Sequence, residues 1–242
     1  MDESQLAAQL SVSPLPQEER FQRRMRLLQA LWRRQKNLPI GLHTGEQLGT
    51  RVDDDNSRRI GLNFLTPDAA QAACLRVDHG EPGDNLETGR LFGNLLASTP
   101  LAFNLFGPFS GHYDQSTTVL SHIMPGRIAE VTGLRWEHNP SRQDPTLSGD
   151  NTACDVFVEY LSPSRRRGFI GIEVKYHESL NRDTADERPR YREVAREMRC
   201  FKNPDSTVLL DAPIGQLWRN HLLCGSMVLR GDYDEGVSVL LY

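Results

Sequence analysis

Two apolar segments joined by a short turn constrain the fold of this chain more than any other feature. They cover residues 153–161 and 169–176, and both are rich in β-branched and aromatic side chains, as strands are. Only residues 162–168 separate them, and these residues suit a turn. Successive strands with so short a connection pair as an antiparallel hairpin. The segments therefore predict the centre of a β-sheet.

The second strand is unusual because Glu173 and Lys175 lie within it. Side chains alternate along a strand, so these two residues share one face with Gly171. If the hairpin is symmetric about residues 164–165, Asp155 lies opposite the stretch from Glu173 to Lys175. The register decides the parity of the facing residues, and the sequence leaves it open. The arrangement that buries both apolar faces brings Asp155, Glu173 and Lys175 together.

Two carboxylates at close range repel one another unless a cation lies between them. A hard divalent ion such as Mg²⁺ suits oxygen ligands, so Asp155 and Glu173 are the candidate ligands. Gly171 leaves room for another group to approach the strand closely. Lys175 could orient or deprotonate an attacking water, or neutralise charge that builds on a phosphate. Together these residues indicate metal-assisted hydrolysis of a phosphodiester.

The rest of the chain supplies helices before the hairpin and a mixture after it. Residues 17–36 have helical spacing, with Phe21, Met25, Leu28 and Trp32 on the expected core side. The arginines of the other face are either solvated or in contact with phosphate. Further expected elements are a loop at 37–62, helices at 66–77, 86–98, 187–201 and 213–229, and strands at 127–137, 207–210 and 237–242; residues 1–15 are expected to fray.

This order predicts an α/β or α+β fold in which helices flank a mixed central sheet. The chain has 242 residues and a net charge of −4, and it lacks an apolar run long enough to span a membrane. No secretory signal is visible, so we expect a cytoplasmic protein. The four cysteines lack the spacing of zinc ligands and are expected to be reduced thiols.

The spacing D-x(17)-E-x-K, with the acid and the E-x-K on neighbouring strands, resembles the PD-(D/E)XK nuclease superfamily, which has the restriction-endonuclease-like fold. The residues that carry it are Cys154-Asp155 and Ile172-Glu173-Val174-Lys175, with Cys where the motif name has Pro. The stretch G-I-E-V-K-Y-H-E also resembles uncharacterised bacterial members described as restriction endonucleases. The family core of helix, three-strand meander, helix and strand is similar to the order from residue 86 onward.

The resemblance implies specific roles for a small set of residues. Asp155 and Glu173 would bind the metal, which is Mg²⁺ with Mn²⁺ as a substitute, and Lys175 would be the catalytic lysine. Glu87 would be the glutamate that many members add from the first core helix, and Gln216 the polar residue of a later helix. The rivals of Glu87 are Glu130 and Glu137.

The resemblance also implies a substrate and an organisation. The expected activity is metal-dependent hydrolysis of DNA, of the restriction endonuclease type, and a homodimer is a further expectation because enzymes that cut both strands often dimerise. Residues 1–85 would form a helical extension and residues 86–242 the nuclease core. A loop at 165–167 carries three arginines that are either solvated or in contact with the DNA backbone.

Two alternatives to an active nuclease remain open on the sequence alone. One is a catalytically silent member of the superfamily that binds nucleic acid or protein. The other is a structural protein in which Asp155, Glu173 and Lys175 form a cross-strand ion pair on a solvated sheet face.

Overall fold

The computed structural model describes residues 2–80, 86–142, 144–178 and 184–242. They form two compact units. The first comprises Met1–Ser110 together with Lys175–Glu178, and the second comprises Gly111–Val174 and Ser179–Tyr242. The boundary expected between residues 85 and 86 adjoins residues 81–85, which lie outside the described part of the chain, and it stays a prediction.

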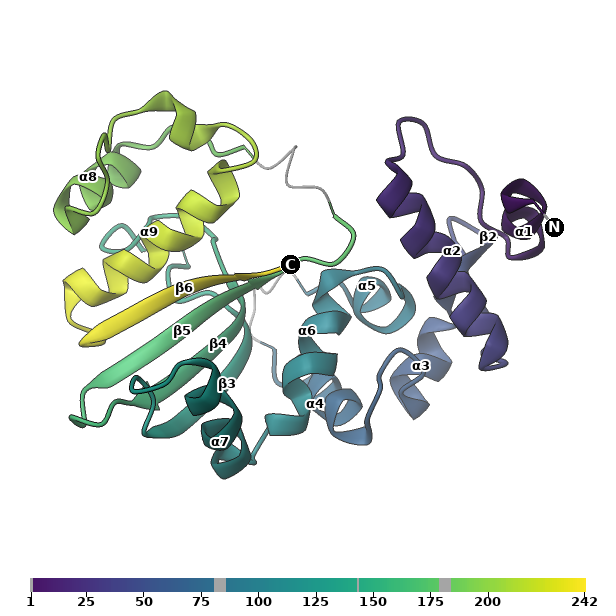
Figure 1. Ribbon diagram of the computed structural model, residues 1–242, viewed down its shortest axis with the longest axis horizontal. Coiled ribbons are helices and arrows are strands. Elements are labelled where there is room, and N and C mark those ends of the chain that lie inside the picture. Colours follow the sequence, from purple (N-terminus) through teal and green to yellow (C-terminus); the bar gives the residue numbers. More distant parts are fainter. Residues whose placement is uncertain (1, 81–85, 143, 179–183) are drawn as a thin grey trace. The chain divides into compact units, whose positions relative to one another are not determined.

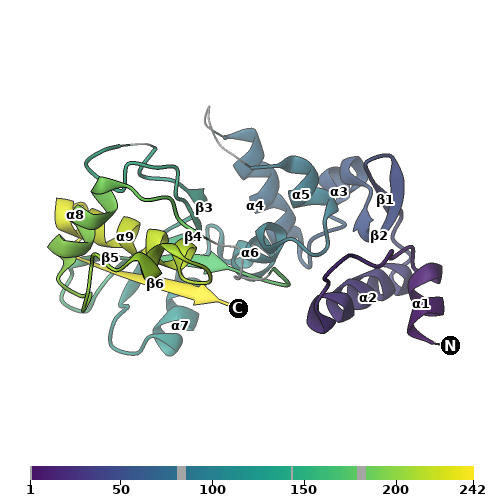
Figure 2. The same cartoon turned by 90° about the horizontal axis from the view of Figure 1, so that it is seen from above.

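The first unit consists of six helices, a single 3₁₀ turn and a two-stranded antiparallel ribbon among the residues described (Figure 1). Its elements are α1 (Glu3–Gln9), α2 (Arg20–Gln35), β1 (Ile40–His43), β2 (Glu46–Val52), α3 (Asp54–Ile60), α4 (Pro67–Asp78), α5 (Thr88–Gly93), α6 (Ser98–Phe106) and η1 (Gly107–Phe109). Figure 2 shows the ribbon of β1 and β2 beside α2, against which β2 packs. The loop expected over 37–62 is therefore wrong, and residues 3–9 form a helix where fraying was expected.

Two helix starts show how far local signals reach. Thr66 caps α4 by accepting a hydrogen bond from the backbone N–H of Ala69 at 3.2 Å, and Pro67 occupies the first helical position, as the sequence predicts. Within the helix expected over 86–98 the structure has only the short α5, and a second helix, α6, begins at Ser98. Pro100 lies in the first turn of α6, where a proline needs no backbone N–H partner.

The buried face of α2 differs from the expected one. Leu27 and Ala30 are buried against α1, whereas Phe21 and Leu28 remain 46% and 51% exposed. Arg33 is buried among them because its guanidinium donates to the backbone oxygens of Gly49 and Leu38, both at 2.9 Å. A buried arginine with partners replaces the solvated arginine expected from the spacing.

The second unit is built on a four-stranded mixed sheet with the order β3-β4-β5-β6. The first three strands are antiparallel neighbours, and β6 runs parallel to β5. Its elements are α7 (Tyr113–Ile123), β3 (Glu130–His138), β4 (Cys154–Leu161), β5 (Arg167–Val174), α8 (Pro189–Met198), η3 (Thr207–Leu210), α9 (Gly215–Arg230) and β6 (Glu235–Leu241). A helix before a three-strand meander, then helices and a last strand, is the restriction-endonuclease-like order. The helix that precedes the meander is α7, which the sequence reasoning missed, and 207–210 is a 3₁₀ turn rather than a strand.

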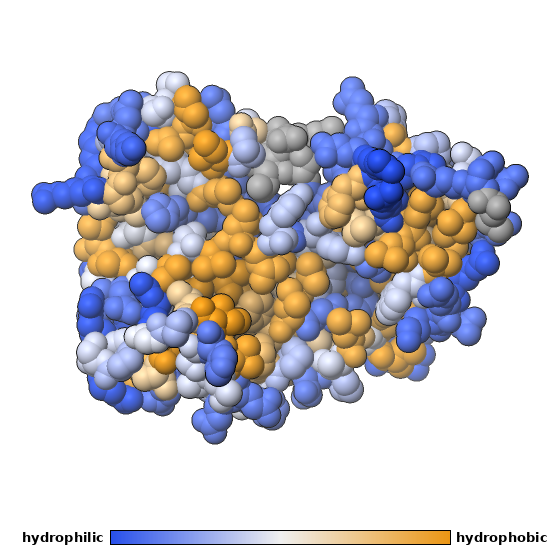
Figure 3. All heavy atoms as spheres, viewed as in Figure 1, coloured by the Kyte–Doolittle hydropathy of each residue, from blue (hydrophilic) through white to orange (hydrophobic). Residues whose placement is uncertain are grey.

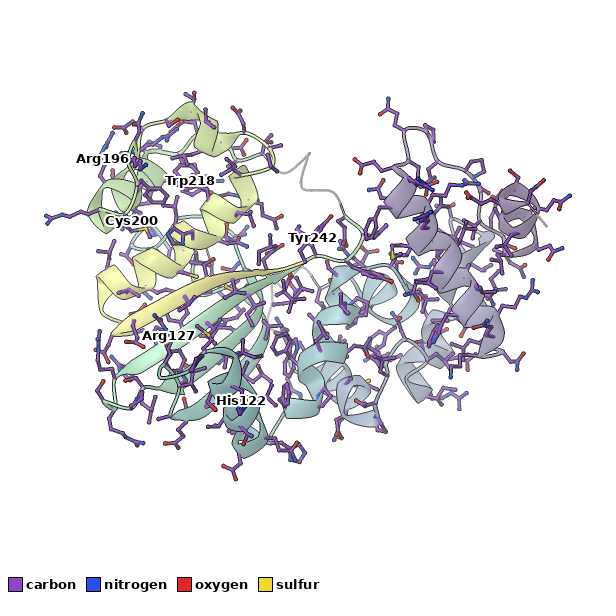
Figure 4. The ribbon with its side chains drawn as sticks, viewed as in Figure 1. His122, Arg127, Arg196, Cys200, Trp218 and Tyr242 are labelled. Atoms are coloured by element: carbon purple, nitrogen blue, oxygen red, sulfur yellow. The ribbon has the colours of Figure 1, made fainter. Side chains whose placement is uncertain are left out.

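Helix α9 packs over β5 and β6 and joins the sheet to α8 (Figure 1). Its sheet side buries Leu223 and Met227 against Phe157 and Phe169, whose rings stack at 5.0 Å. On its other side Trp218 points toward α8 (Figure 4) and meets Tyr191 edge to face. This double-sided packing fixes the rotation of α9, and with it the residues that α9 presents to the end of β5.

Candidate active site

Asp155 and Glu173 lie on neighbouring strands at the same level of the sheet. The pairs Val156 with Ile172 and Phe157 with Gly171 set a register that places position 155 opposite position 173. The hairpin is centred on residue 164, and this register settles the parity of the facing residues, which the sequence left open. The backbone N–H of Val174 donates to Asp155 Oδ2 at 2.6 Å. Asp155 is thus oriented by the amide of the residue between Glu173 and Lys175.

Glu173 is only 7% exposed, and side-chain amides of α9 hold both of its carboxylate oxygens. Gln216 donates from Nε2 to Oε1 at 2.6 Å, and Asn220 donates from Nδ2 to Oε2 at 2.7 Å. Amide donors orient a carboxylate and satisfy its lone pairs without neutralising its charge. The structure therefore brings together three of the candidate site residues, Asp155, Glu173 and Gln216, within the second unit.

Asn220 is the site residue that the sequence reasoning missed. It follows Gln216 by four residues on a helix, so both side chains leave the same face of α9. That spacing was visible in the sequence. The sequence does not show the rotation of α9. That rotation depends on the packing of Leu223 against the sheet and of Trp218 against α8.

Gly171 serves packing rather than ligand access. A Cβ at this position would lie 2.9 Å from both Cys154 Sγ and Cys224 Sγ, closer than real Cβ contacts. The groups that approach the strand closely at Gly171 are therefore two thiols, one from β4 and one from α9. The hydrogen bond with Cys224, together with burial, raises the pKa of Cys154 well above its ordinary value. Both cysteines are reduced and buried, as expected.

Lys175 lies one residue beyond the end of β5, because the strand ends at Val174 rather than at the expected Tyr176. Its own side chain is half-buried. The segment Lys175–Glu178 belongs to the first unit. Lys175 is therefore joined to the carboxylate strand by one peptide bond, while the residues that follow it pack with the helices of the first unit.

Glu178 anchors this segment. Its carboxylate accepts hydrogen bonds from the backbone N–H of Ser98 at 3.1 Å and of Tyr176 at 2.9 Å, and from the guanidinium of Arg90 at 3.2 Å. Burial acts to raise the pKa of Glu178, but the backbone N–H groups of Tyr176, Glu178 and Ser98 outweigh it and lower the pKa. Gln22 adds a hydrogen bond to the His177 carbonyl at 3.3 Å.

The three candidates for an added glutamate lie in different places. Glu87 is exposed at the start of α5 in the first unit. Glu130 pairs with Leu161, at the opposite end of β4 from Asp155, and its carboxylate meets Arg165 at 2.9 Å. The pairs Trp136 with Val156 and His138 with Cys154 place Glu137 at the level of Asp155. Its φ of 49° turns the backbone out of the regular strand.

The arginines of the β4–β5 turn lie away from the carboxylates. The turn follows Leu161, six residues along β4 from Asp155, which is roughly 20 Å of strand at about 3.3 Å per residue. Arg166 donates to the Asp234 carbonyl at 2.7 Å, and Arg167 donates to the Gly231 carbonyl at 3.4 Å. The turn therefore lies beyond the end of β4 that is away from Asp155.

Among the residues that the structure describes, no three histidine, cysteine, aspartate or glutamate side chains gather as a metal-binding group. The candidate protein donors are therefore the carboxylates of Asp155 and Glu173. Over the same residues, no helix is both long and apolar enough to cross a membrane.

A model of the PD-(D/E)XK nuclease superfamily matches residues 16–242, which is nearly the whole chain. No curated protein and no solved structure gives a significant match. The matched range contains the mixed sheet, the facing acids on β4 and β5, and the E-x-K sequence at the end of β5. The chain therefore belongs to the PD-(D/E)XK nuclease superfamily.

Proposed function

We propose that the protein is a metal-dependent nuclease that hydrolyses phosphodiester bonds of DNA, with Asp155, Glu173 and Lys175 at its centre. The observation that supports this most is the hydrogen bond from the Val174 N–H to Asp155 Oδ2 at 2.6 Å. It holds the carboxylate of β4 against the backbone of the E-x-K sequence. A chance E-x-K on a solvated strand would not have a buried glutamate and an oriented acid from the next strand.

The donor chemistry at this point fits a hard divalent cation such as Mg²⁺. Asp155 and Glu173 supply carboxylate oxygens from facing positions, and no cysteine or histidine is needed. Gln216 and Asn220 hold Glu173 in one orientation through neutral amides. When bound, the cation would polarise the phosphate and neutralise part of its charge.

The other steps fall to the chain itself. A water oxygen attacks phosphorus and gives up a proton, the bond from phosphorus to the leaving oxygen breaks, and the leaving oxygen takes up a proton, so that the products are a phosphomonoester and an alcohol. Lys175, as an ammonium group, neutralises the negative charge that grows on the phosphate oxygens or orients the attacking water. Glu87 remains the proposed additional glutamate of the site, and comparison of its alanine variant with that of Glu137 tests this role.

The test is cleavage of plasmid DNA in Mg²⁺ or Mn²⁺, with EDTA as the metal-free control. Asp155→Ala and Lys175→Ala should each lower the rate by about a hundredfold or more. The matched controls are Asp114→Ala on α7 and Lys202→Ala, both exposed residues of the second unit that should cleave like the unchanged protein. Glu87→Ala, compared with Glu137→Ala, assigns the added glutamate.

Three results would contradict the proposal. One is undiminished metal-dependent cleavage by Asp155→Ala. A second is equal cleavage in EDTA and in Mg²⁺. A third is binding of DNA in Ca²⁺ without any cleavage in Mg²⁺ or Mn²⁺, which would instead support the catalytically silent alternative. Restriction-type activity predicts discrete fragments from a single plasmid, and gel filtration tests the expected homodimer.

A further inference from the structure

The first unit contains a preformed cavity of about 310 Å³ beside the segment that follows Lys175. One wall is the α2 surface of Leu28, Gln29 and Trp32, and the floor comes from the start of α6, including Pro100. Tyr176 closes the side next to Lys175. In the region of α2, Figure 3 shows orange hydrophobic residues among blue hydrophilic ones. The cavity is thus lined by aromatic and apolar groups at a hydrophilic surface.

Hydrogen bonds hold both the side chain and the backbone of Tyr176 in place. Its hydroxyl accepts a hydrogen bond from Gln29 Nε2 at 2.5 Å, and its backbone N–H donates to Glu178 at 2.9 Å. Glu178 is in turn held by the Ser98 N–H at the start of α6. A ligand that stacks on this ring would not need to order it first, which favours binding.

The amides that border the cavity hold the protein backbone. Asn104 accepts from the Leu65 N–H at 2.6 Å and donates to the Asn63 carbonyl at 3.0 Å. Asn63 donates to the carbonyls of Leu91 and Asn94 at 2.9 and 3.2 Å. With these donors engaged, recognition in the cavity depends on stacking and shape more than on a hydrogen-bond code. The cavity therefore best fits a flat aromatic ring, whatever polar groups that ring carries at its edge.

The chain itself links the cavity to the proposed chemistry. Tyr176 follows Lys175 directly, and successive Cα atoms are about 3.8 Å apart. The side chains of Lys175 and Tyr176 therefore start from neighbouring points of the backbone. A strand whose phosphate contacts Lys175 would bring the base of that nucleotide, or of the next one, to the side of Tyr176. The same helix that carries Trp32 also presents exposed cations for the phosphates, namely Arg20, Arg24, Arg34 and Lys36.

We propose that this cavity receives one unstacked nucleobase of the strand whose phosphate Lys175 contacts. The proposal rests on the proposed nuclease function and adds to it a binding site for a base. Withdrawing a base from its stack is costly, and stacking on aromatic side chains offsets that cost. Since every base has an aromatic face, the site should tolerate all bases while requiring that one be present.

The experiment measures binding of a single-stranded oligonucleotide that carries 2-aminopurine, in Ca²⁺ so that binding is observed without cleavage. The fluorescence of 2-aminopurine changes when its stacking partners change, and scanning the label along the strand locates the bound position. Tyr176→Ala and Trp32→Ala should weaken binding by about tenfold to a hundredfold. Tyr176→Phe keeps the ring, loses only the hydroxyl contact with Gln29, and should restore most of the affinity.

The matched control is Tyr113→Ala, because Tyr113 is an exposed tyrosine (38%) of the second unit, on α7. Its affinity should equal that of the unchanged protein, and thermal unfolding of each variant verifies folding. An abasic nucleotide at the located position should weaken binding as much as Tyr176→Ala does. If Tyr176→Ala and Tyr113→Ala bind equally, or the abasic strand binds as tightly as the intact one at every position, the proposal is overturned.

The outcomes also separate this proposal from the nuclease function. Loss of binding with the abasic strand in a protein that never cleaves would support the base site and refute the nuclease. Metal-dependent cleavage that is unchanged by an abasic position and by Tyr176→Ala would support the nuclease and refute the base site. Binding of an apolar peptide that 2-aminopurine oligonucleotides cannot displace would assign the cavity to a protein partner and overturn the base site.

Discussion

Glu173 is a carboxylate that the sheet buries together with its hydrogen-bond partners. The side chain is 7% exposed, and burial of an ionised carboxylate without partners is costly. Gln216 and Asn220 supply the missing hydrogen bonds at 2.6 and 2.7 Å. Both amides are neutral donors, so they orient the carboxylate without forming an ion pair with it. The two amides therefore stabilise the fold and hold Glu173 in place for the role of metal ligand that we propose.

Replacing Asn220 by Asp tests this account at the scale of one residue. The change removes a donor 2.7 Å from Glu173 Oε2 and places a second carboxylate there. Like charges at this distance repel, so we expect Asn220→Asp to lower the free energy of unfolding by about 1–3 kcal/mol in EDTA. Added Mg²⁺ should recover part of that loss. Urea denaturation with and without Mg²⁺ measures both effects.

Asn203→Asp is the control for this substitution. Asn203 is exposed in the same unit, and its side-chain oxygen accepts from the Asp205 N–H at 3.2 Å, a bond that an aspartate keeps. It should leave stability and its Mg²⁺ dependence unchanged. An Asn220→Asp protein as stable as the original in EDTA would show that the amide of Asn220 does not stabilise the buried side chain of Glu173.

At the scale of elements, the β4–β5 hairpin could be predicted and the helix faces could not. A short turn between two apolar strands leaves few registers, so the sequence placed Asp155 opposite the stretch from Glu173 to Lys175, and the structure selects Glu173. Helix α2 has two candidate faces. The apolar side with Leu28 looked like the core, yet Leu28 is 51% exposed.

The reason lies in contacts between distant segments. Arg33 is buried because the carbonyls of Leu38 and Gly49 accept hydrogen bonds from its guanidinium, and those carbonyls are positioned by the loop and by the β1–β2 ribbon. The spacing of apolar and charged residues along α2 does not indicate that Arg33 has these hydrogen-bond acceptors. The same holds for Asn220, whose role depends on the rotation of α9, and for Gly171, whose neighbours are thiols from β4 and α9. Local caps and turns are encoded locally, whereas side-chain partners are not.

The α2 assignment makes a prediction about two adjacent arginines. Arg33→Ala removes donors from the buried carbonyls of Gly49 and Leu38, and burial already lowers the pKa of Arg33. We expect it to lower the free energy of unfolding by about 2–4 kcal/mol. Arg34→Ala, one residue further on the exposed face, should cost about 0.5 kcal/mol or less. Urea denaturation of both variants decides the matter. Equal costs would mean that the expected solvated face was the right one.

At the scale of the whole molecule, the path of the chain is as informative as its elements. The chain leaves the first unit at Ser110, builds the meander of the second unit, and supplies Lys175–Glu178 to the first unit before returning. The residue proposed for charge neutralisation thus stands next to the point where the path changes units. Helices α5 and α6 contribute to that point through Arg90 and Ser98, which bind Glu178.

Glu178→Gln tests this anchoring through its dependence on pH. Hydrogen bonds lower the folded-state pKa of Glu178 below the ordinary value of 4.5, despite its burial. The ionised form is therefore favoured by folding, and its stabilisation is present above pH 4.5 and is lost as the pH falls through the depressed folded-state pKa. At pH 7 we expect Glu178→Gln to cost about 1–2 kcal/mol and to speed amide exchange of Tyr176 and Ser98. Toward more acidic pH the free energies of unfolding of the two proteins should converge, because both side chains are then neutral.

The control is Glu46→Gln, at an exposed residue at the start of β2 in the same unit, and it should have the same free energy of unfolding as the unchanged protein at any pH. A gap between wild type and Glu178→Gln that stays constant from neutral to acidic pH would show that the charge of Glu178 does not hold the segment, and that Lys175 is positioned by the strand alone.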